Sequence, residues 1–267
     1  GVYSIQIVEL LNEIIYLDNA KLVAVDHPSD VEVYFDERLM LVPPFPERRI
    51  HAVADARPPV SAFDGRGNDI LSRISQPDGL YHDDYAFLPY EGFAEEHSIV
   101  LDLGDLSAAE SIVLLVNGWT HYVTSYGLYQ ASEDGVPPML PRLDVLDEDG
   151  AWVAVDANMG FPAGQPKTMT YDLTGKFLTD DFRIKITTNL QVFLDQVLVS
   201  TSVGDVSPRT TELEPVVGDL HWKGYPLLLG AGGTRGVRPA AYDYDVVQDE
   251  KERWTGPAGE YTRYGDV

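Results

Sequence analysis

The stretch FRIKITTNLQVFLDQVLVSTS, residues 182–202, decides the fold class of this chain. In its first half Phe182, Ile184 and Ile186 occupy every second position, and basic residues stand between them. This period of two is typical of a β-strand with one face against a core. The second half, LQVFLDQVLV, is mostly apolar and rich in Val, and it follows the turn residue Asn189. The stretch therefore predicts two consecutive strands.

Short runs of the same kind recur along the chain, bounded by Gly, Pro, Asn and Asp. SIVLLVNGW, residues 111–119, is apolar almost throughout and predicts a strand buried on both faces. The best helix candidate is NDILSRI, residues 68–74. Many short strands between frequent turn signals indicate an all-β sandwich or barrel. We predict strands at residues 4–10, 21–25, 32–35, 51–54, 98–103, 111–116, 143–146, 152–155, 168–172, 182–187 and 191–199.

Two of these strands resemble strands of galactose-binding-like jelly rolls. IVLDLG, residues 99–104, ends in Leu-Gly like the strand that opens such a sandwich, and VFLDQVLV, residues 192–199, resembles the strand that closes it. The resemblance implies a jelly-roll β-sandwich over residues 98–203. A β-rich segment with long loops precedes it at residues 1–97. Residues 204–267 form an extended tail rich in Gly and aromatic residues, or the start of a further domain.

Longer strings in the sequence resemble one protein family. They are YLDNAKLVAVDHP (16–28), GWTHY (118–122), DEDGAWVAVDANMGFPAGQPKTMTYDLTGKF (147–177) and YTRYGDV (261–267). They are similar to the region that follows the propeller-like repeats in bacterial FG-GAP and ASPIC/UnbV proteins, the cartilage-acidic-protein-like group. The resemblance implies that the chain is part of a larger secreted, periplasmic or cell-envelope protein. It assigns no functional residue, because these motifs carry no catalytic role in the group.

Both ends of the chain have a strand-like composition. We expect residues 1–10 and 255–267 to pair with sheets of this module or of neighbouring chain, because an uncovered strand edge invites association. We also expect further sequence to follow residue 267 in the intact polypeptide.

The composition excludes several classes of function. A formal charge of -24 over 267 residues repels phosphate backbones and anionic lipid, so nucleic acid is not an expected partner. No apolar run approaches the roughly 20 residues that a spanning helix needs, so we expect no membrane insertion. The chain has 0 Cys, which excludes disulfides, thiolate metal sites and cysteine nucleophiles. The expected partners are a glycan or a protein, including other domains of the same polypeptide.

The acidic stretch LDVLDEDGAWVAV, residues 143–155, resembles a calcium loop at first sight. With Gly150 at the sixth position of an EF-hand loop, the first ligand would be Val145, which cannot bind calcium. Asp-Gly between two β-type runs is instead a strong hairpin signal. We predict a hairpin and no cofactor, and a weak calcium site at Asp147 and Asp149 stays open as the alternative.

The histidines offer one candidate metal site. His82 and Asp84 form a His-x-Asp pair, and either His97 or His121 lies downstream of it. Non-haem oxygenases with jelly-roll folds hold their metal with two His and one carboxylate. The alternative function is therefore a metal-dependent oxygenase that uses His82, Asp84 and His121. The competing interpretation is that these histidines lie in loops and bond to the backbone.

Aromatic residues provide the candidate binding site. NGWTHYVTSYGLYQ places Trp119, Tyr122, Tyr126 and Tyr129 close together. Carbohydrate-binding modules stack exposed aromatic rings on sugar faces, although aromatics more often pack under loops. From these residues, together with what the family resemblance implies, we predict a non-catalytic extracytoplasmic module for glycan or protein recognition, or for scaffolding within a larger secreted protein.

Overall fold

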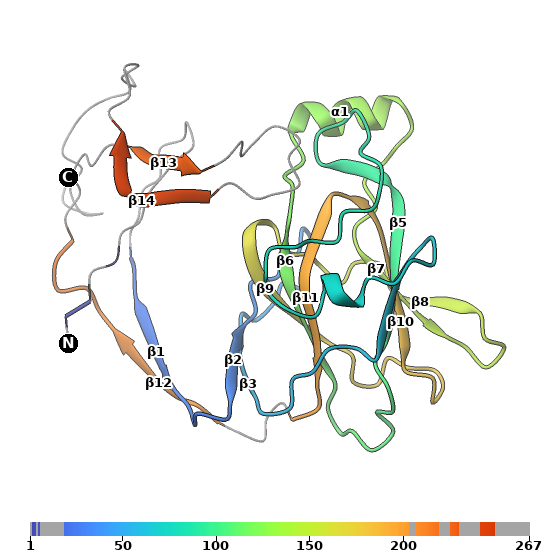
Figure 1. The fold of residues 1–267 in the computed structure, drawn as a ribbon, viewed down its shortest axis with the longest axis horizontal. Helices are drawn as coiled ribbons and strands as arrows, with labels where there is room; N and C mark the ends of the chain where they lie inside the picture. The colour runs from blue at the N-terminus through green and yellow to red at the C-terminus, as the bar shows by residue number, and fades with distance from the viewer. Residues whose placement is uncertain are drawn as a thin grey trace. The chain divides into compact units, whose positions relative to one another are not determined.

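The computed structural model describes residues 2–3, 5, 19–202, 207–218, 225–229 and 241–248, which belong to two compact units (Figure 1). The larger unit contains the described residues between His27 and Pro208. The smaller unit contains those up to Asp26 and from Arg209 onward. All strand pairs among the described residues are antiparallel.

The described residues of the smaller unit form two two-stranded sheets. Their strands are β1 (Leu22–Asp26) with β12 (Arg209–Leu213), and β13 (Tyr225–Leu229) with β14 (Ala241–Gln248). Beside the first pair, Lys21 Nζ lies 2.9 Å from Glu212 Oε2. Three strands thus lie in the region that the sequence marks as a tail. β12 is exposed along its whole length and lacks the apolar alternation on which sequence prediction relies.

The larger unit is an all-β sandwich, as predicted. One sheet has five strands in the order β4-β5-β10-β7-β8, the other has three in the order β11-β6-β9, and β2 and β3 form a separate pair. The strands are β2 (Glu32–Phe35), β3 (Ile50–Val53), β4 (Ser61–Asp64), β5 (Phe93–Asp102), β6 (Val113–Thr120), β7 (Arg142–Leu146), β8 (Trp152–Asp156), β9 (Gly164–Asp172), β10 (Arg183–Leu190) and β11 (Val192–Ser200).

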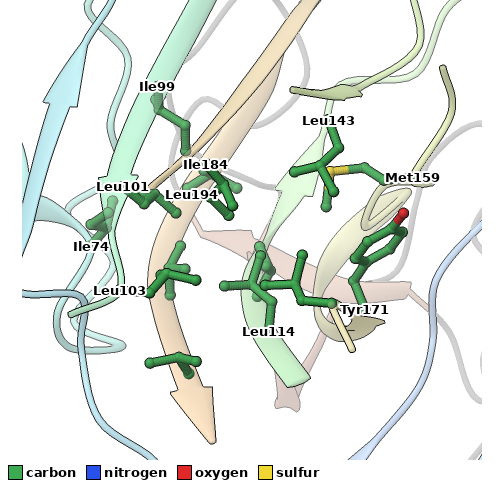
Figure 2. Close-up of a cluster of buried hydrophobic side chains, with 14 of the residues drawn as sticks. Ile74, Ile99, Leu101, Leu103, Leu114, Leu143, Met159, Tyr171, Ile184 and Leu194 are labelled. Atoms are coloured by element: carbon green, nitrogen blue, oxygen red, sulfur yellow. The ribbon is translucent and has the colours of Figure 1, made fainter. Parts of the chain in front are cut away.

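Apolar side chains from both sheets meet in one buried cluster (Figure 2). Ile99 and Leu101 of β5 and Ile184 of β10 come from the five-stranded sheet. Leu114 of β6 and Tyr171 of β9 come from the three-stranded sheet. Burying one such aliphatic side chain stabilises the fold by about 1.5–3 kcal/mol. The apolar alternation of the strands therefore accounts for the association of the two sheets.

β6 is buried on both faces, as its apolar sequence predicts. Leu114 and Val116 belong to the cluster between the sheets. Val113 and Leu115 point the other way and form a second buried cluster with Val53 of β3. The β2–β3 pair therefore covers the outer face of the three-stranded sheet.

Asp55, two residues after β3, anchors the end of β11. Its carboxylate accepts hydrogen bonds from the hydroxyls of Ser200, Thr201 and Ser202, each at 2.6 Å. Burial alone raises the pKa of Asp55, but these hydrogen bonds outweigh burial and hold the pKa below its usual range. The ionised carboxylate thus ties two segments distant in sequence together.

The predicted strands between residues 21 and 199 are confirmed, although some of their ends are displaced. Sequence reasoning misses the four-residue strand β4. The predicted helix at residues 68–74 is wrong, because only Leu71–Arg73 form a 3-10 turn there. The structure instead contains α1 (Ser125–Glu133), whose sequence includes the helix-disfavouring Gly127.

The sandwich begins before residue 98. β5 begins at Phe93 and pairs with β4, so β4 and the start of β5 belong to the same unit as the later strands. The sandwich therefore starts earlier than the boundary at residue 98 that we predicted from the sequence, because strand pairing and not composition defines the unit. The galactose-binding-like jelly roll is a finer description of this sandwich and stays a prediction.

Two expectations concern parts of the chain at its ends. The strand expected at residues 4–10 lies outside the described residues, apart from residue 5, and so does the segment 255–267. Among the described residues, no helix is both long and apolar enough to cross a membrane.

Candidate functional site

The acidic stretch at residues 147–150 is the turn of a hairpin, as predicted. β7 and β8 pair on either side of it, and Gly150 has a φ of 75°, which favours glycine. Asp147 Oδ1 accepts hydrogen bonds from the N–H groups of Asp149 at 3.0 Å and Ala151 at 2.8 Å. This oxygen closes the turn itself, so calcium at Asp147 and Asp149 stays a prediction in competition with these bonds.

Three exposed tyrosines lie on and next to α1, and we call them the tyrosine surface. Tyr122, Tyr126 and Tyr129 are 62%, 74% and 59% exposed. Tyr126 and Tyr129 are three residues apart, so their side chains are neighbours on the helix. The buried residues of α1 are Gly127 and Ala131, four residues apart on another face. The helix therefore docks through that face and presents its tyrosines to solvent.

Local contacts fix the position of α1. The N-cap Thr124 accepts a hydrogen bond from Gly127 N–H at 3.0 Å. A Cβ at Gly127 would lie 3.1 Å from the Glu91 carbonyl oxygen, so a larger residue here would press against the loop before β5. At the other end, the Tyr90 hydroxyl donates to Asp134. Figure 1 shows α1 beyond the end of β6 and beside the start of β5.

Trp119 is not part of the tyrosine surface. It is 6% exposed, and its ring stacks on Phe193 with 4.4 Å between centroids and 15° between planes. Tyr81 meets it edge-on at 6.2 Å. Trp119 lies in β6, and the segment before β5 covers this end of the strand with Tyr81 and Tyr85. Of the four aromatics predicted to bind ligand, the structure therefore leaves only the three tyrosines exposed.

A polar cavity of about 240 Å³ lies beside the point where the chain leaves β4, and we call it the β4–β5 cavity. β4 pairs with β5 as far as Asp64, which lies opposite Ile99, and the chain then turns away. The cavity is lined by residues from this turn, from the segment before β5, from β5 and from β10. They are Asp64, Gly65, Arg66, His82, Asp84, Glu95, Glu96, His97, Ser98 and Thr187.

Asp64 organises the turn that borders the cavity. Its carboxylate accepts from the N–H groups of Arg66 at 2.9 Å and Asn68 at 2.8 Å, and from the Asn68 side chain at 2.8 Å. Burial raises the pKa of Asp64, but the Asn68 and Arg66 hydrogen bonds lower it to a net value below its usual range. The turn places the Arg66 guanidinium between Asp84, at 3.2 Å, and Glu95. The one guanidinium of the cavity is thus paired with two carboxylates.

Both histidines of the cavity have lowered pKa values. Burial lowers the pKa of His97 to about 4, and its ring stacks on Tyr85 with 3.9 Å between centroids. Burial also lowers the pKa of His82, which is 5% exposed, although Asp64, Asp83 and Asp84 partly offset this effect. The imidazoles are therefore uncharged at neutral pH, and each provides one hydrogen-bond donor and one acceptor.

Thr187 of β10 is buried and incompletely bonded. It is 4% exposed, and its hydroxyl oxygen has no hydrogen-bond partner among the described residues. Thr187 lies opposite Ser98 of β5, and both residues line the β4–β5 cavity. A buried hydroxyl without a partner costs about 1–3 kcal/mol. The hydroxyl oxygen itself is sealed from solvent, although other parts of Thr187 border the cavity.

The proposed metal ligands do not converge. His82 and Asp84 line the β4–β5 cavity, but His121 does not. The His121 ring lies against Tyr122 with 5.0 Å between centroids. Within the described part of the chain, no group of three or more His, Cys, Asp or Glu residues is placed to hold a metal ion. The geometry therefore gives no support to the oxygenase alternative.

The sequence gives uneven signals for the cavity residues. DGRGN, residues 64–68, is a clear turn signal, and the polar run EEHS at residues 95–98 interrupts an apolar strand. The spacing of His82, Asp84 and His97 is also a local signal, because two His and one Asp are a typical set of metal ligands. Thr187 carries no local signal, because only the pairing of β5 with β10 brings it to the cavity.

The comparisons with known proteins identify no relative. No family model, no curated protein and no solved structure matches the chain. The resemblance to FG-GAP and ASPIC/UnbV proteins therefore stays a prediction.

Proposed function

We propose that this chain is a non-catalytic recognition module that binds neutral glycans at the tyrosine surface. The observation that carries the proposal is the exposure of Tyr122, Tyr126 and Tyr129 on and beside a helix that is fixed to the sandwich. Exposed aromatic rings are costly to leave in water, and a rigid support lowers the entropy lost when a ligand stacks on them. A protein partner at the same surface is the alternative that the experiment below separates.

The charge of the chain restricts the kind of glycan. With -24 formal charges, the protein repels uronic-acid and sulfated polysaccharides at low and moderate salt. Neutral hexose and pentose polymers carry no such penalty, and their rings present apolar C–H faces to tyrosine. We therefore favour neutral polysaccharides over anionic ones.

The same proposal places the module outside the cytoplasm, within a larger secreted or envelope protein of the FG-GAP and ASPIC/UnbV type. The supporting argument is the resemblance of the sequence strings together with the all-β sandwich. A five-stranded and a three-stranded antiparallel sheet are also compatible with a galactose-binding-like jelly roll.

Affinity electrophoresis tests the proposal in native gels that contain galactan, mannan, xylan or β-glucan. We expect at least one of these polymers to retard the wild-type chain. Stacking that buries roughly 50 Å² of one tyrosine face contributes about 1.3 kcal/mol, or about tenfold in affinity. The double variant Tyr126→Ala/Tyr129→Ala should therefore bind about a hundredfold more weakly and lose its retardation.

A matched control uses a tyrosine in the smaller unit. Tyr244 of β14 is 52% exposed, so Tyr244→Ala removes a comparable exposed ring far in sequence from α1. This variant should be retarded like the wild type. The proposal is refuted if none of the four polymers retards the wild type, or if the double variant and Tyr244→Ala migrate alike.

A further inference from the structure

We infer that residues 79–85 form an acid-sensitive strap, which covers Trp119 and Phe193 at neutral pH and detaches in mild acid while the two sheets stay paired. The strap lies between the 3-10 turn (Leu71–Arg73) and β5. Its opening does not depend on the function proposed for the tyrosine surface.

The strap is fastened to the sandwich by few hydrogen bonds. It lies along β11, the edge strand of the three-stranded sheet. His82 N–H donates to the Leu194 carbonyl oxygen at 3.0 Å, and the Tyr85 hydroxyl donates to the Val192 carbonyl oxygen at 2.8 Å. His82 and Leu194 form an isolated bridge, whereas β11 pairs with β6 along its whole length. The strap can therefore open without separating β11 from β6.

Beneath the strap lies the aromatic pair of Trp119 and Phe193. The Tyr81 ring meets the Trp119 ring edge-on with 6.2 Å between centroids, and the Tyr85 ring lies 5.9 Å from the Phe193 ring. These four side chains belong to one buried cluster. Their packing holds the strap closed at neutral pH, and opening of the strap uncovers an aromatic surface on β6 and β11.

The acid sensitivity comes from two histidines on either side of Tyr85. The His97 ring of β5 stacks on the Tyr85 ring with 3.9 Å between centroids and 14° between planes. The His82 ring of the strap meets Tyr85 edge-on at 6.1 Å, and His82 is 5% exposed. A proton taken up by either ring in the closed state places a charge where burial has removed water. In the open state water surrounds both rings, so protonation favours the open state.

The pKa of His97 gives the direction and the size of the effect. Burial lowers the pKa of His97 to about 4 in the closed state, against about 6.5 for a hydrated imidazole. The open state therefore binds more protons, and the closed strap loses stability as the pH falls from 6.5 toward 4. Between pH 7.5 and pH 5.0, His97 alone should raise the ratio of open to closed strap about 30-fold.

Charged groups face the two imidazoles from β4, the turn after it, the 3-10 turn, the strap and β5. They are Asp64, Arg66, Arg73, Asp83, Asp84, Glu95 and Glu96. The carboxylates raise the pKa values of the imidazoles, and the arginines and the neighbouring imidazole lower them. Burial is the largest cause for both His82 and His97, so both pKa values stay lowered in the presence of these charges.

Asp195 of β11 acts in the opposite direction. Its Oδ1 accepts a hydrogen bond from Gly79 N–H at 3.0 Å, and burial raises its pKa. A carboxyl with a raised pKa favours the closed state in acid. His82 adds to the effect of His97 because burial lowers its pKa as well. We therefore set His82 against Asp195 and base the expected change on His97 alone.

Amide hydrogen exchange of the intact chain, measured by NMR at pH 7.5 and pH 5.0, tests the strap. The His82 amide reports opening of the strap. The Val199 amide is the matched control, because it joins the same strand β11 to the Arg57 carbonyl oxygen at 2.8 Å through another isolated bridge. After correction for intrinsic exchange rates, protection of the His82 amide should fall about 30-fold at pH 5.0. Protection of the Val199 amide should change by less than about threefold.

Two variants assign the effect to His97. His97→Phe keeps an aromatic ring against Tyr85 and cannot take up a proton, so the change at the His82 amide should shrink to about tenfold or less. His27→Gln removes an exposed histidine that lies outside the strap and should leave the change at about 30-fold.

Three results would overturn the acid-sensitive strap. They are equal protection of the His82 amide at both pH values, an equal loss of protection at Val199, and the same pH dependence in His97→Phe as in His27→Gln. The first two need only the wild-type chain, so they decide the matter even if His97→Phe does not fold. None of the three concerns Tyr126 or Tyr129, so they do not count against the glycan proposal.

Discussion

Replacing Trp119 by Ala should destabilise the sandwich strongly, because its indole is a core side chain and not a ligand platform. Trp119 is 6% exposed and stacks on Phe193 with 4.4 Å between ring centroids. A buried Trp covers roughly 200 Å², and at about 25 cal/mol per Å² this contributes about 5 kcal/mol as an upper value. We therefore expect Trp119→Ala to lower the free energy of unfolding by about 3–5 kcal/mol.

Thermal unfolding followed by far-ultraviolet circular dichroism measures this loss without relying on tryptophan fluorescence. For a unit of this size, 1 kcal/mol corresponds to about 2–4 °C, so the melting temperature should fall by at least about 6 °C. Trp119→Phe should lose only about 1–2 kcal/mol, because the indole N–H has no partner among the described residues and only volume is removed. Tyr126→Ala, at a residue 74% exposed, is the control and should change stability by less than about 0.5 kcal/mol. A melting temperature of Trp119→Ala within about 2 °C of the wild type would refute the assignment of Trp119 to the core.

Two further perturbations test the contacts that hold the sandwich together. Asp55→Ala should cost about 1–2 kcal/mol at pH 7, because the carboxylate accepts from the hydroxyls of residues 200–202. The pKa of Asp55 is lower in the folded than in the unfolded chain, so this contribution is complete above about pH 4 and is lost as the pH falls from there through the depressed folded pKa. The urea midpoints of wild type and variant should therefore stay equally far apart between pH 7 and about pH 4 and draw together only in stronger acid, and a gap that widens in acid would contradict this. Gly118→Ala should unfold or severely destabilise the chain, because its Cβ would lie 2.3 Å from the Phe193 carbonyl oxygen across the β6–β11 pair. Gly218→Ala, where no described residue beyond the chain neighbours lies within 4 Å of the added carbon, should be neutral, and equal melting temperatures of the two glycine variants would disprove the close approach.

The two candidate sites differ in how well the sequence predicts them. The tyrosine surface follows from a dense local run of aromatics, and the sequence correctly draws attention to Tyr122, Tyr126 and Tyr129. Exposure cannot be read from that run, because Trp119 has the same local surroundings and is buried by a segment more than twenty residues away. The β4–β5 cavity is harder to predict from the sequence, because it is lined by residues as distant in sequence as Asp64 and Thr187.

The sequence alone determined the β7–β8 hairpin and every strand of the larger unit except β4, because period-two alternation and Asp-Gly turns are properties of neighbouring residues. It also determined the acidic charge and the exclusions that follow from having no cysteine. Only the tertiary structure decided that β4 and the start of β5 belong to the sandwich, that α1 forms around Gly127, and that Trp119 is core. The physical reason is that strand pairing and burial depend on which distant segments meet. Thr187, for example, borders the β4–β5 cavity only because β10 pairs with β5 in the register that sets it opposite Ser98.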